Sequence, residues 1–268
     1  MAGGSTRWQG RSVVSKVTSL LDAFSVERPV LSLGEITRIT GLPSSTAYRM
    51  ACDLVAWGGL ERAPGGSGYR VGMRLWEVGA LAPRTADLRE VALPFMQDLY
   101  EVTRENVHLA VLEGHEALYV ETISGPQALR VRSRRAGRLP LHATGVGKVL
   151  LAHAPDQLVR DVMAVGLRRF TPHTIVDPDR LHRVLGDVRR NGIAYAREEM
   201  SVGSLSVAAP VTDVDGEVTA ALAVVLRSGR RDLSRLGVAV RTAAVSTSRS
   251  LRRQTWPAPL SGRASATV

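Results

Sequence analysis

The 268-residue sequence has a single cysteine, two lysines, few aromatic residues and no long apolar run. Cys52 alone excludes a disulfide framework within the chain and a metal cluster of several cysteines. No segment approaches the roughly 18 consecutive apolar residues that suggest a membrane-spanning helix. The first residues also lack the apolar centre of a secretory signal. We therefore expect a cytoplasmic protein in a reducing compartment, with no membrane partner.

Apolar residues make up 44% of the chain and charged residues 22%, which is near the average for globular proteins. The length fits one large domain or two modest ones, at roughly 100–200 residues per domain. The net charge is +10, and arginine supplies nearly all of the positive groups. Such an excess favours a nucleic-acid partner. An arginine bias also follows from GC-rich codon usage, so the charge does not decide the matter by itself.

Residues 12–73 have the pattern of three helices followed by a β-hairpin. The second helix begins at Ser32, where Glu35 completes a capping box. The third helix spans residues 43–57, with Trp57 on its apolar face. A glycine-rich turn at 64–68 then joins two short strands. This order of elements is that of a winged helix-turn-helix.

The outer face of the third helix carries the candidate DNA contacts. A helix about 10–12 Å wide fits the major groove, where side chains reach the base edges. Hydroxyl groups in its first turn suit phosphates or bases, and Arg49 can donate two hydrogen bonds to guanine. The candidate DNA-binding residues are Ser44, Ser45, Thr46, Tyr48, Arg49, Arg62 and Arg70. The same unit would also suit docking to a protein, with Arg49 merely solvated.

The rest of the chain divides into a linker, a second domain and tails. Residues 74–104 are expected to form linker helices that pair with a second chain, interrupted at Pro83 and kinked or restarted at Pro94. Residues 105–253 alternate strands and helices, which predicts an α+β domain with an antiparallel sheet. Its predicted strands are 107–113, 117–123, 128–133, 193–198, 204–212 and 217–227, and its helices 144–153, 155–165, 178–191 and 232–253. Residues 1–11 and 254–268 are expected to be disordered.

Several sequence segments, in their order along the chain, resemble those of the IclR family of transcriptional regulators. They are Leu33-Gly-Glu-Ile-Thr-Arg-Ile-Thr-Gly-Leu-Pro-Ser-Ser-Thr-Ala-Tyr-Arg49, Tyr69-Arg-Val-Gly72, Leu88-Arg-Glu-Val-Ala-Leu-Pro94, Val107-His-Leu-Ala-Val111, Arg138-Leu-Pro-Leu-His-Ala-Thr-Gly-Val-Gly-Lys148, Arg169-Phe-Thr-Pro-His-Thr-Ile175 and Ala208-Ala-Pro210. The resemblance covers residues 12 to about 253. It implies a winged helix before a GAF-like effector domain, a small organic-acid effector, and dimers or dimers of dimers on palindromic operator DNA.

The chain departs from the family pattern at several positions. Ser44 replaces a frequent basic residue, and Ser206 stands where cysteine is common. Members that bind small oxo-acids have an aspartate where this chain has Ala196, and serines where it has Ala223 and Val225. An apolar wall favours a ligand with a hydrophobic body. We therefore expect an aromatic or branched aliphatic monoacid rather than glyoxylate or pyruvate.

The segment from Thr144 to Lys148 is the predicted binding site for the carboxylate of the effector. It is not a phosphate loop, since a Walker A motif needs glycine where His142 stands and Ser or Thr where Val149 stands. We expect Thr144 to cap a helix whose glycines leave N–H groups uncovered for a carboxylate. A plain capped helix is the alternative. The candidate effector-binding residues are Thr144, Gly145, Val146, Ala196, Ser206, Ala223 and Val225.

No catalytic or metal constellation emerges from the remaining polar residues. The six histidines lack metal-ligand spacing, and Cys52 has no evident catalytic partners. Adjacent Glu198 and Glu199 would face opposite sides of a strand, so we expect structural hydrogen bonds from them. We thus expect no enzyme, no cofactor and no metal. The resemblance to the IclR family favours a ligand-responsive repressor. The alternatives are an activator, a small-acid enzyme with a helical head, and a DNA-binding protein whose second domain only oligomerises.

Overall fold

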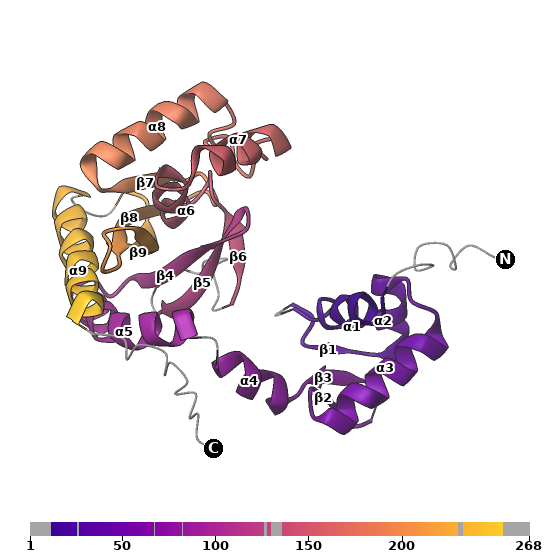
Figure 1. The fold of residues 1–268 in the computed structure, drawn as a ribbon. Coiled ribbons are helices and arrows are strands. Elements are labelled where there is room, and N and C mark those ends of the chain that lie inside the picture. The colour runs from indigo at the N-terminus through magenta and orange to yellow at the C-terminus, as the bar shows by residue number, and fades with distance from the viewer. Residues whose placement is uncertain are drawn as a thin grey trace, which may run out of the picture. The chain divides into compact units, whose positions relative to one another are not determined.

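The computed structural model describes residues 12–25, 27–66, 68–81, 83–125, 128–129, 136–229 and 233–253. The chain forms two compact units, Met1–Ala86 and Asp87–Val268 (Figure 1). Each unit has its own antiparallel sheet. The tails expected at 1–11 and 254–268 lie outside the described residues. No helix of the described residues is long and apolar enough to span a membrane.

The first unit is a winged helix-turn-helix, as the sequence predicts. Its elements are α1 (Val13–Leu21), β1 (Val30–Leu31), α2 (Leu33–Thr40), α3 (Ser44–Trp57), β2 (Leu60–Arg62), β3 (Tyr69–Val71) and α4 (Met73–Ala80). Strand β1 was not expected; it pairs with β3 and makes a three-stranded sheet in the order β1-β3-β2. Leu20, Ile36 and Ala47 lie in the core between the helices and this sheet.

Local signals set the helix ends in this unit. The capping box predicted at Ser32 is present, with the Ser32 hydroxyl accepting from the Glu35 N–H and the Glu35 carboxylate accepting from the Ser32 N–H. Helix α2 ends where Gly41 adopts a left-handed conformation at φ 72°. The prediction for Trp57 was wrong, because its side chain is 47% exposed and the helix core stops at Leu54.

Helix α5 (Pro83–Thr103) begins at Pro83, where the sequence predicts an interruption after α4, and continues through Pro94. A proline fits a helix start because no backbone donor is needed there. At Pro94 a single hydrogen bond is lost, at a cost of about 3 kcal/mol. Burial of Ala92, Met96 and Leu99 in the core offsets that cost, so the helix continues. The expectation that a new helix starts at Pro94 was therefore wrong, and the alternative of a kink there stays a prediction.

The second unit is the expected α+β domain around a six-stranded antiparallel sheet. Its elements are β4 (Asn106–Glu113), β5 (Glu116–Ile123), β6 (Arg138–Pro140), α6 (Gly145–Ala152), α7 (Asp156–Val165), α8 (Pro178–Asn191), β7 (Ala194–Arg197), β8 (Ser204–Thr212), β9 (Val218–Arg227) and α9 (Leu233–Arg253). The strand order is β6-β5-β4-β9-β8-β7. Ala128 and Leu129 are not in a strand, and the rest of the strand predicted at 128–133 lies outside the described residues. The third strand at this edge is β6 instead.

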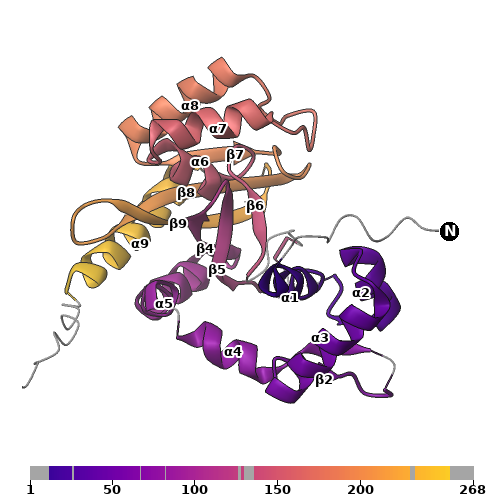
Figure 2. The ribbon, with the colours of Figure 1, turned by 45° about the vertical axis from the view of Figure 1, so that its right-hand side comes forward.

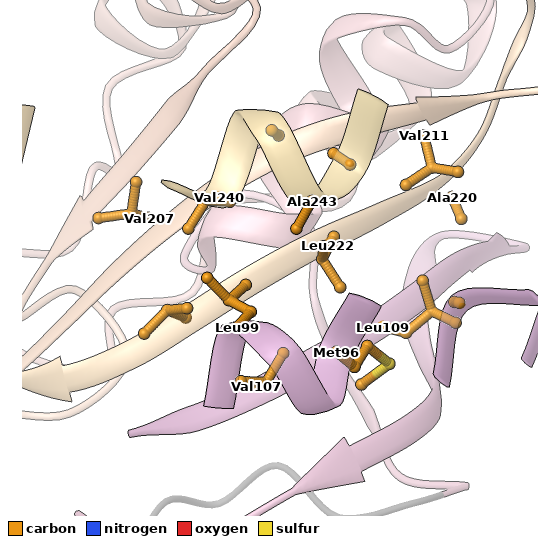
Figure 3. Close-up of a cluster of buried hydrophobic side chains, with 14 of the residues drawn as sticks. Met96, Leu99, Val107, Leu109, Val207, Val211, Ala220, Leu222, Val240 and Ala243 are labelled. Carbon is orange, nitrogen blue, oxygen red and sulfur yellow. The ribbon is translucent and has the colours of Figure 1, made fainter. Parts of the chain in front are cut away.

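Helices cover both faces of this sheet. Helices α5 and α9 pack on one face, where Met96, Leu222 and Val240 meet (Figure 3). Helices α6, α7 and α8 lie over the other face (Figure 2). Side chains of β9 alternate between the two, so Leu222 faces α5 and α9 while Ala223 belongs to the core under α6. Small alanines on the α6 side leave room for a short helix to approach the sheet.

Candidate functional site

The outer face of α3 is open to solvent. Ser44, Ser45, Tyr48 and Arg49 are exposed and Thr46 is half-buried, while Ala47 lies in the core on the opposite face. Pro43 precedes the helix and provides no side-chain cap for its first N–H groups. An exposed helix start with unsatisfied donors and a positive dipole end attracts anions. The sequence candidates on α3 therefore share one surface suited to a polyanion.

Arg49 projects one turn beyond the start of this helix. Among the described residues, no carboxylate lies within ion-pair distance of its guanidinium. Its five N–H donors keep a fixed fork geometry. The side chain is thus available for a bidentate contact with a base edge or a phosphate.

The two hairpin arginines differ in their surroundings. The Arg62 guanidinium lies 4.4 Å from the centre of the Tyr69 ring, which holds it without neutralising its charge. Arg70 donates from Nε and Nη2 to the same oxygen of Glu61, at 3.0 and 2.8 Å. Both partners of this pair are substantially exposed. Of the two, Arg62 is the better prepared for a phosphate, because Arg70 must first leave Glu61.

A small cavity, named here the inner pocket, lies on the α6 side of the sheet in the second unit. Its volume is about 50 Å³. Four of the residues expected at an effector site line it: Thr144, Ala196, Ser206 and Val225. The lining residues that the sequence did not single out are His108, Tyr119, Leu139, Ala143, Met200, Ser201 and Ser204. Gly145, Val146 and Ala223 are not among the lining residues; all three are buried next to it around α6.

The start of α6 is tightly packed. Thr144 Oγ1 accepts from the Gly147 N–H at 3.0 Å and donates to the Pro140 carbonyl at 3.1 Å. A Cβ on Gly145 would lie 2.5 Å from Ser206 Oγ, and one on Gly147 would lie 2.4 Å from the Leu141 carbonyl oxygen. The expectation that both glycines expose N–H groups was wrong for Gly147, whose N–H is satisfied by Thr144. Both glycines allow a close approach of α6 to its neighbours.

The polar side of the inner pocket is uncharged at neutral pH. Burial lowers the pKa of His108 to about 4, so its imidazole is neutral. The Tyr119 ring packs edge-on against it at 5.3 Å between centroids. Burial raises the pKa of Tyr119, whose hydroxyl shares a hydrogen bond with Thr144. No Asp, Glu, Lys or Arg of the described chain lines this pocket, so a carboxylate there would depend on neutral donors.

Behind the pocket, a buried ion pair joins α6 to the segment after β7. Lys148 Nζ donates to Glu199 Oε1 at 2.5 Å and to the Tyr195 carbonyl at 3.1 Å. Lys148 is fully buried, and burial lowers its pKa against the opposing effect of Glu199. Glu199 Oε2 is buried with no hydrogen-bond partner among the described residues. The pair fixes the segment that places Met200 and Ser201 in the pocket wall.

The two adjacent glutamates make structural hydrogen bonds, as the sequence predicts, but the expectation that they face opposite sides of a strand was wrong. Both follow the end of β7, and Glu198 adopts a left-handed backbone conformation at φ 57°. Its Oε1 accepts from the Ser228 hydroxyl at 2.6 Å, whereas Glu199 pairs with Lys148. Within the described part of the chain, no three His, Cys, Asp or Glu side chains are grouped to hold a metal ion.

Comparison with known proteins gives matches along nearly the whole described chain. Residues 13–64 match the family model "IclR helix-turn-helix domain", and residues 81–249 match "Bacterial transcriptional regulator IclR C-terminal". The regulator XynR of Escherichia coli K12 is 32% identical over 82% of this chain and 87% of its own. The repressor AllR of the same organism is 32% identical over 72% of each chain.

Solved structures give the same result. A crystal structure of an IclR homologue from Microbacterium hydrocarbonoxydans, in complex with 4-hydroxybenzoate, superposes with a TM-score of 0.86. It is 36% identical, and the match covers 90% of this chain and all of that one. The likeness therefore includes both units.

Proposed function

Because this chain belongs to the IclR family of bacterial transcriptional regulators, we propose that it represses genes from a palindromic operator, as a dimer or a dimer of dimers. Its relatives are named as regulators, so its role is transcriptional rather than enzymatic. The observation that carries the proposal is the exposed start of α3, which has no side-chain cap and lies in one unit, while the second unit holds a small pocket. Its site of action is the cytoplasm, where bacterial operators lie.

In the proposed DNA complex, α3 enters the major groove. Two α3 helices of a symmetric dimer would contact half-sites about 34 Å apart. Arg49 contacts a base edge, and Ser44, Ser45, Thr46 and Tyr48 contact the backbone or bases near the helix start. Arg62 and Arg70 hold the flanking phosphates. Of these two, Arg62 contributes more, because Glu61 competes for Arg70.

The proposed effector is an aromatic or branched aliphatic monoacid bound in the inner pocket. The Microbacterium homologue with 4-hydroxybenzoate supports an aromatic acid. Leu139, Ala196, Met200 and Val225 offer apolar contacts to the body of such a ligand. Hydroxyl groups and the start of α6, with Gly145 and Val146, supply donors for one carboxylate. A second charge would remain unpaired in this uncharged pocket, which disfavours diacids.

The size of the pocket links binding to regulation. Pockets that hold drug-sized ligands measure about 300–1,000 Å³, whereas this one measures about 50 Å³. An aromatic acid therefore binds a wider state of the domain than the one described here. A ligand shifts the balance between two states only by its difference in affinity for them, typically about 1–3 kcal/mol. We infer that the wider state binds the operator less well.

Two measurements on the full chain test this function. Mobility shift should show specific binding to DNA upstream of the regulated genes, relaxed by an aromatic or branched monoacid. Ala196→Leu fills the pocket and should abolish the response to acid while operator binding persists. Ala164→Leu, the same change at an exposed position of α7, is the matched control. Absence of any specific DNA complex would contradict the regulator, and a response to glyoxylate alone would contradict the effector class.

A further inference from the structure

A second and larger cavity, named here the outer groove, lies beside the inner pocket and has no part in the function proposed above. Strand β6 and the residues after it form one side of the groove. The end of α7 and the loop from Gly166 to Phe170 form the other. Its volume is about 420 Å³, within the usual range for small-molecule sites. We propose that the outer groove is a second ligand site, which binds an aromatic monocarboxylate.

Charge in the groove favours an anion. Arg138 and Arg168 both line it, and Glu116 is the one carboxylate among the described lining residues. None of the three forms an ion pair within the described part of the chain. His142, which also lines the groove, is held neutral because burial lowers its pKa. Arg138 Nη1 donates to the Glu113 carbonyl at 3.3 Å, which does not neutralise its charge. Two guanidinium groups and one carboxylate thus line the groove, which leaves an excess of positive charge for a ligand.

Arg168 is held in place for such a contact. Its guanidinium lies 5.2 Å from the centre of the Phe170 ring. The Arg168 carbonyl accepts a hydrogen bond from His142 Nε2 at 2.9 Å. Fixing both ends of an arginine lowers the entropy lost on binding, and a guanidinium fork matches a carboxylate with two parallel hydrogen bonds. This arrangement suits recognition of a carboxylate better than a freely moving surface arginine does.

The apolar part of the groove suits an aromatic ring. Val162 and Val165 at the end of α7 and Phe170 in the loop that follows line it, and Val165 is 81% exposed. A ring that covers these side chains removes apolar surface from water. A ligand with one carboxylate and one flat apolar body therefore satisfies both halves of the site. An inorganic anion would leave the apolar half uncovered.

The groove is distinct from the inner pocket but shares a wall with it. Leu139 and Met200 line both cavities. Methionine is unbranched and adapts its shape readily, so a ligand in the groove can change the room available in the inner pocket. The second site does not depend on DNA binding or on the identity of the inner ligand.

Calorimetry and fluorine NMR with para-fluorobenzoate on the full chain test this site. The wild type should bind two molecules per chain. Arg168→Gln should weaken one of the two by roughly 10- to 100-fold, the loss expected for a charge-assisted hydrogen-bond pair. Arg169→Gln, an equal change of charge at the adjacent exposed residue outside the groove, should leave both sites intact. Ala196→Leu should remove the other site and spare the one that needs Arg168.

Three outcomes would overturn the proposal. One is identical binding curves for Arg168→Gln and Arg169→Gln. Another is a single site that Ala196→Leu removes completely. The third is a change in oligomeric state on Arg168→Gln, measured by sedimentation, without binding of the probe to the wild type. That result would assign the groove to a second copy of the chain.

Discussion

Helices α3 and α6 both begin with short polar or glycine residues, yet their first turns are opposite in environment. The start of α3 is exposed, and Pro43 gives it no side-chain cap. Every residue of α6 is buried, and Thr144 caps its first turn. Both helix starts carry the same partial positive charge. What differs is whether water or the protein satisfies the donors before a ligand arrives.

The difference shows which kind of anion each start can bind. At α3, the donors are solvated and lie near unpaired Arg49, so a large polyanion can replace the water. At α6, a ligand must fit a pocket whose lining carries no formal charge among the described residues. We expect DNA binding to weaken steeply with salt, because released counterions drive it. Binding in the inner pocket should change less with salt, because salt screens buried contacts to a carboxylate much less than it screens exposed charges.

The largest expected effect on stability comes from removing the buried ion pair between Lys148 of α6 and Glu199. Lys148→Met leaves Glu199 buried without its partner and should lower the free energy of unfolding by about 3–5 kcal/mol, as for other buried pairs. Chemical denaturation measures this change. Lys16→Met, at the other lysine of the chain, is a half-buried control and should have little effect. The double variant Lys148→Met with Glu199→Leu should recover much of the loss. If Lys148→Met were as stable as the control Lys16→Met, the ion pair between Lys148 and Glu199 would contribute nothing to stability.

The neutral state of His108 should make the second unit sensitive to acid. Its pKa is about 4 in the folded chain and 6.5 in the ordinary range, so the unfolded chain binds a proton first as the pH falls. Stability is therefore present above pH 6.5 and is lost down to about pH 4, by about 3 kcal/mol in all. Below that pH both states are protonated and this loss stops. Burial lowers the pKa of His142 also, which acts in the same direction.

Denaturation curves between pH 7 and 4 measure this loss for the full chain. His108→Gln should flatten the dependence on pH, whereas His182→Gln, at an exposed position of α8, should keep it. An unchanged slope in His108→Gln would mean that other groups cause the acid sensitivity.

Local patterns predicted most helix ends but not the walls of the inner pocket. The capping box at Ser32 and the glycine stop at Gly41 depend on neighbours within one turn, and the structure has both. His108 and Tyr119 stand on adjacent strands, β4 and β5, whose register brings the two rings together. No spacing within the sequence gives that register. Alternation along each strand shows which residues share a face of the sheet, but not which of the two covered faces lies under α6.

The position of the pocket along a strand was also hidden from the sequence. Ala223 and Val225 face the same side of β9, since they are two residues apart. Only Val225 lines the inner pocket, while Ala223 lies in the core under α6. The position of the start of α6 decides this, and it depends on how closely Gly145 approaches Ser206. A contact between residues so far apart in the chain follows from the fold and not from a local motif.

A smaller effect, confined to binding, is expected at the exposed helix. Arg49→Ala should weaken specific operator binding by roughly 1–3 kcal/mol. The melting temperature should stay nearly unchanged, because Arg49 has no ion-pair partner among the described residues. Fluorescence anisotropy with operator and scrambled DNA measures the change. Arg160→Ala, at an exposed position of α7, removes the same charge as a control. Unaltered operator affinity would rule out a base contact, and a large loss of stability would make Arg49 structural.

The smallest effect should come from the pair that holds Arg70. Glu61→Gln removes the carboxylate that accepts both Arg70 hydrogen bonds. Such an exposed pair contributes within about 1 kcal/mol, so stability should hardly change. Freed from Glu61, Arg70 can neutralise one more phosphate, and the slope of log K against log salt should steepen by about 0.9.

Titration of operator binding over a range of salt tests whether Glu61 restrains Arg70. Glu77→Gln, which breaks the exposed pair with Arg74 in α4, is the matched control and should leave the slope unchanged. The double variant Glu61→Gln with Arg70→Gln should return to the slope of Arg70→Gln alone, because the gain passes entirely through Arg70. Weaker binding in Glu61→Gln would instead mean that Glu61 aims Arg70 at the phosphate. In that case the hairpin, like the start of α6, would depend on a partner within the protein to prepare its donors.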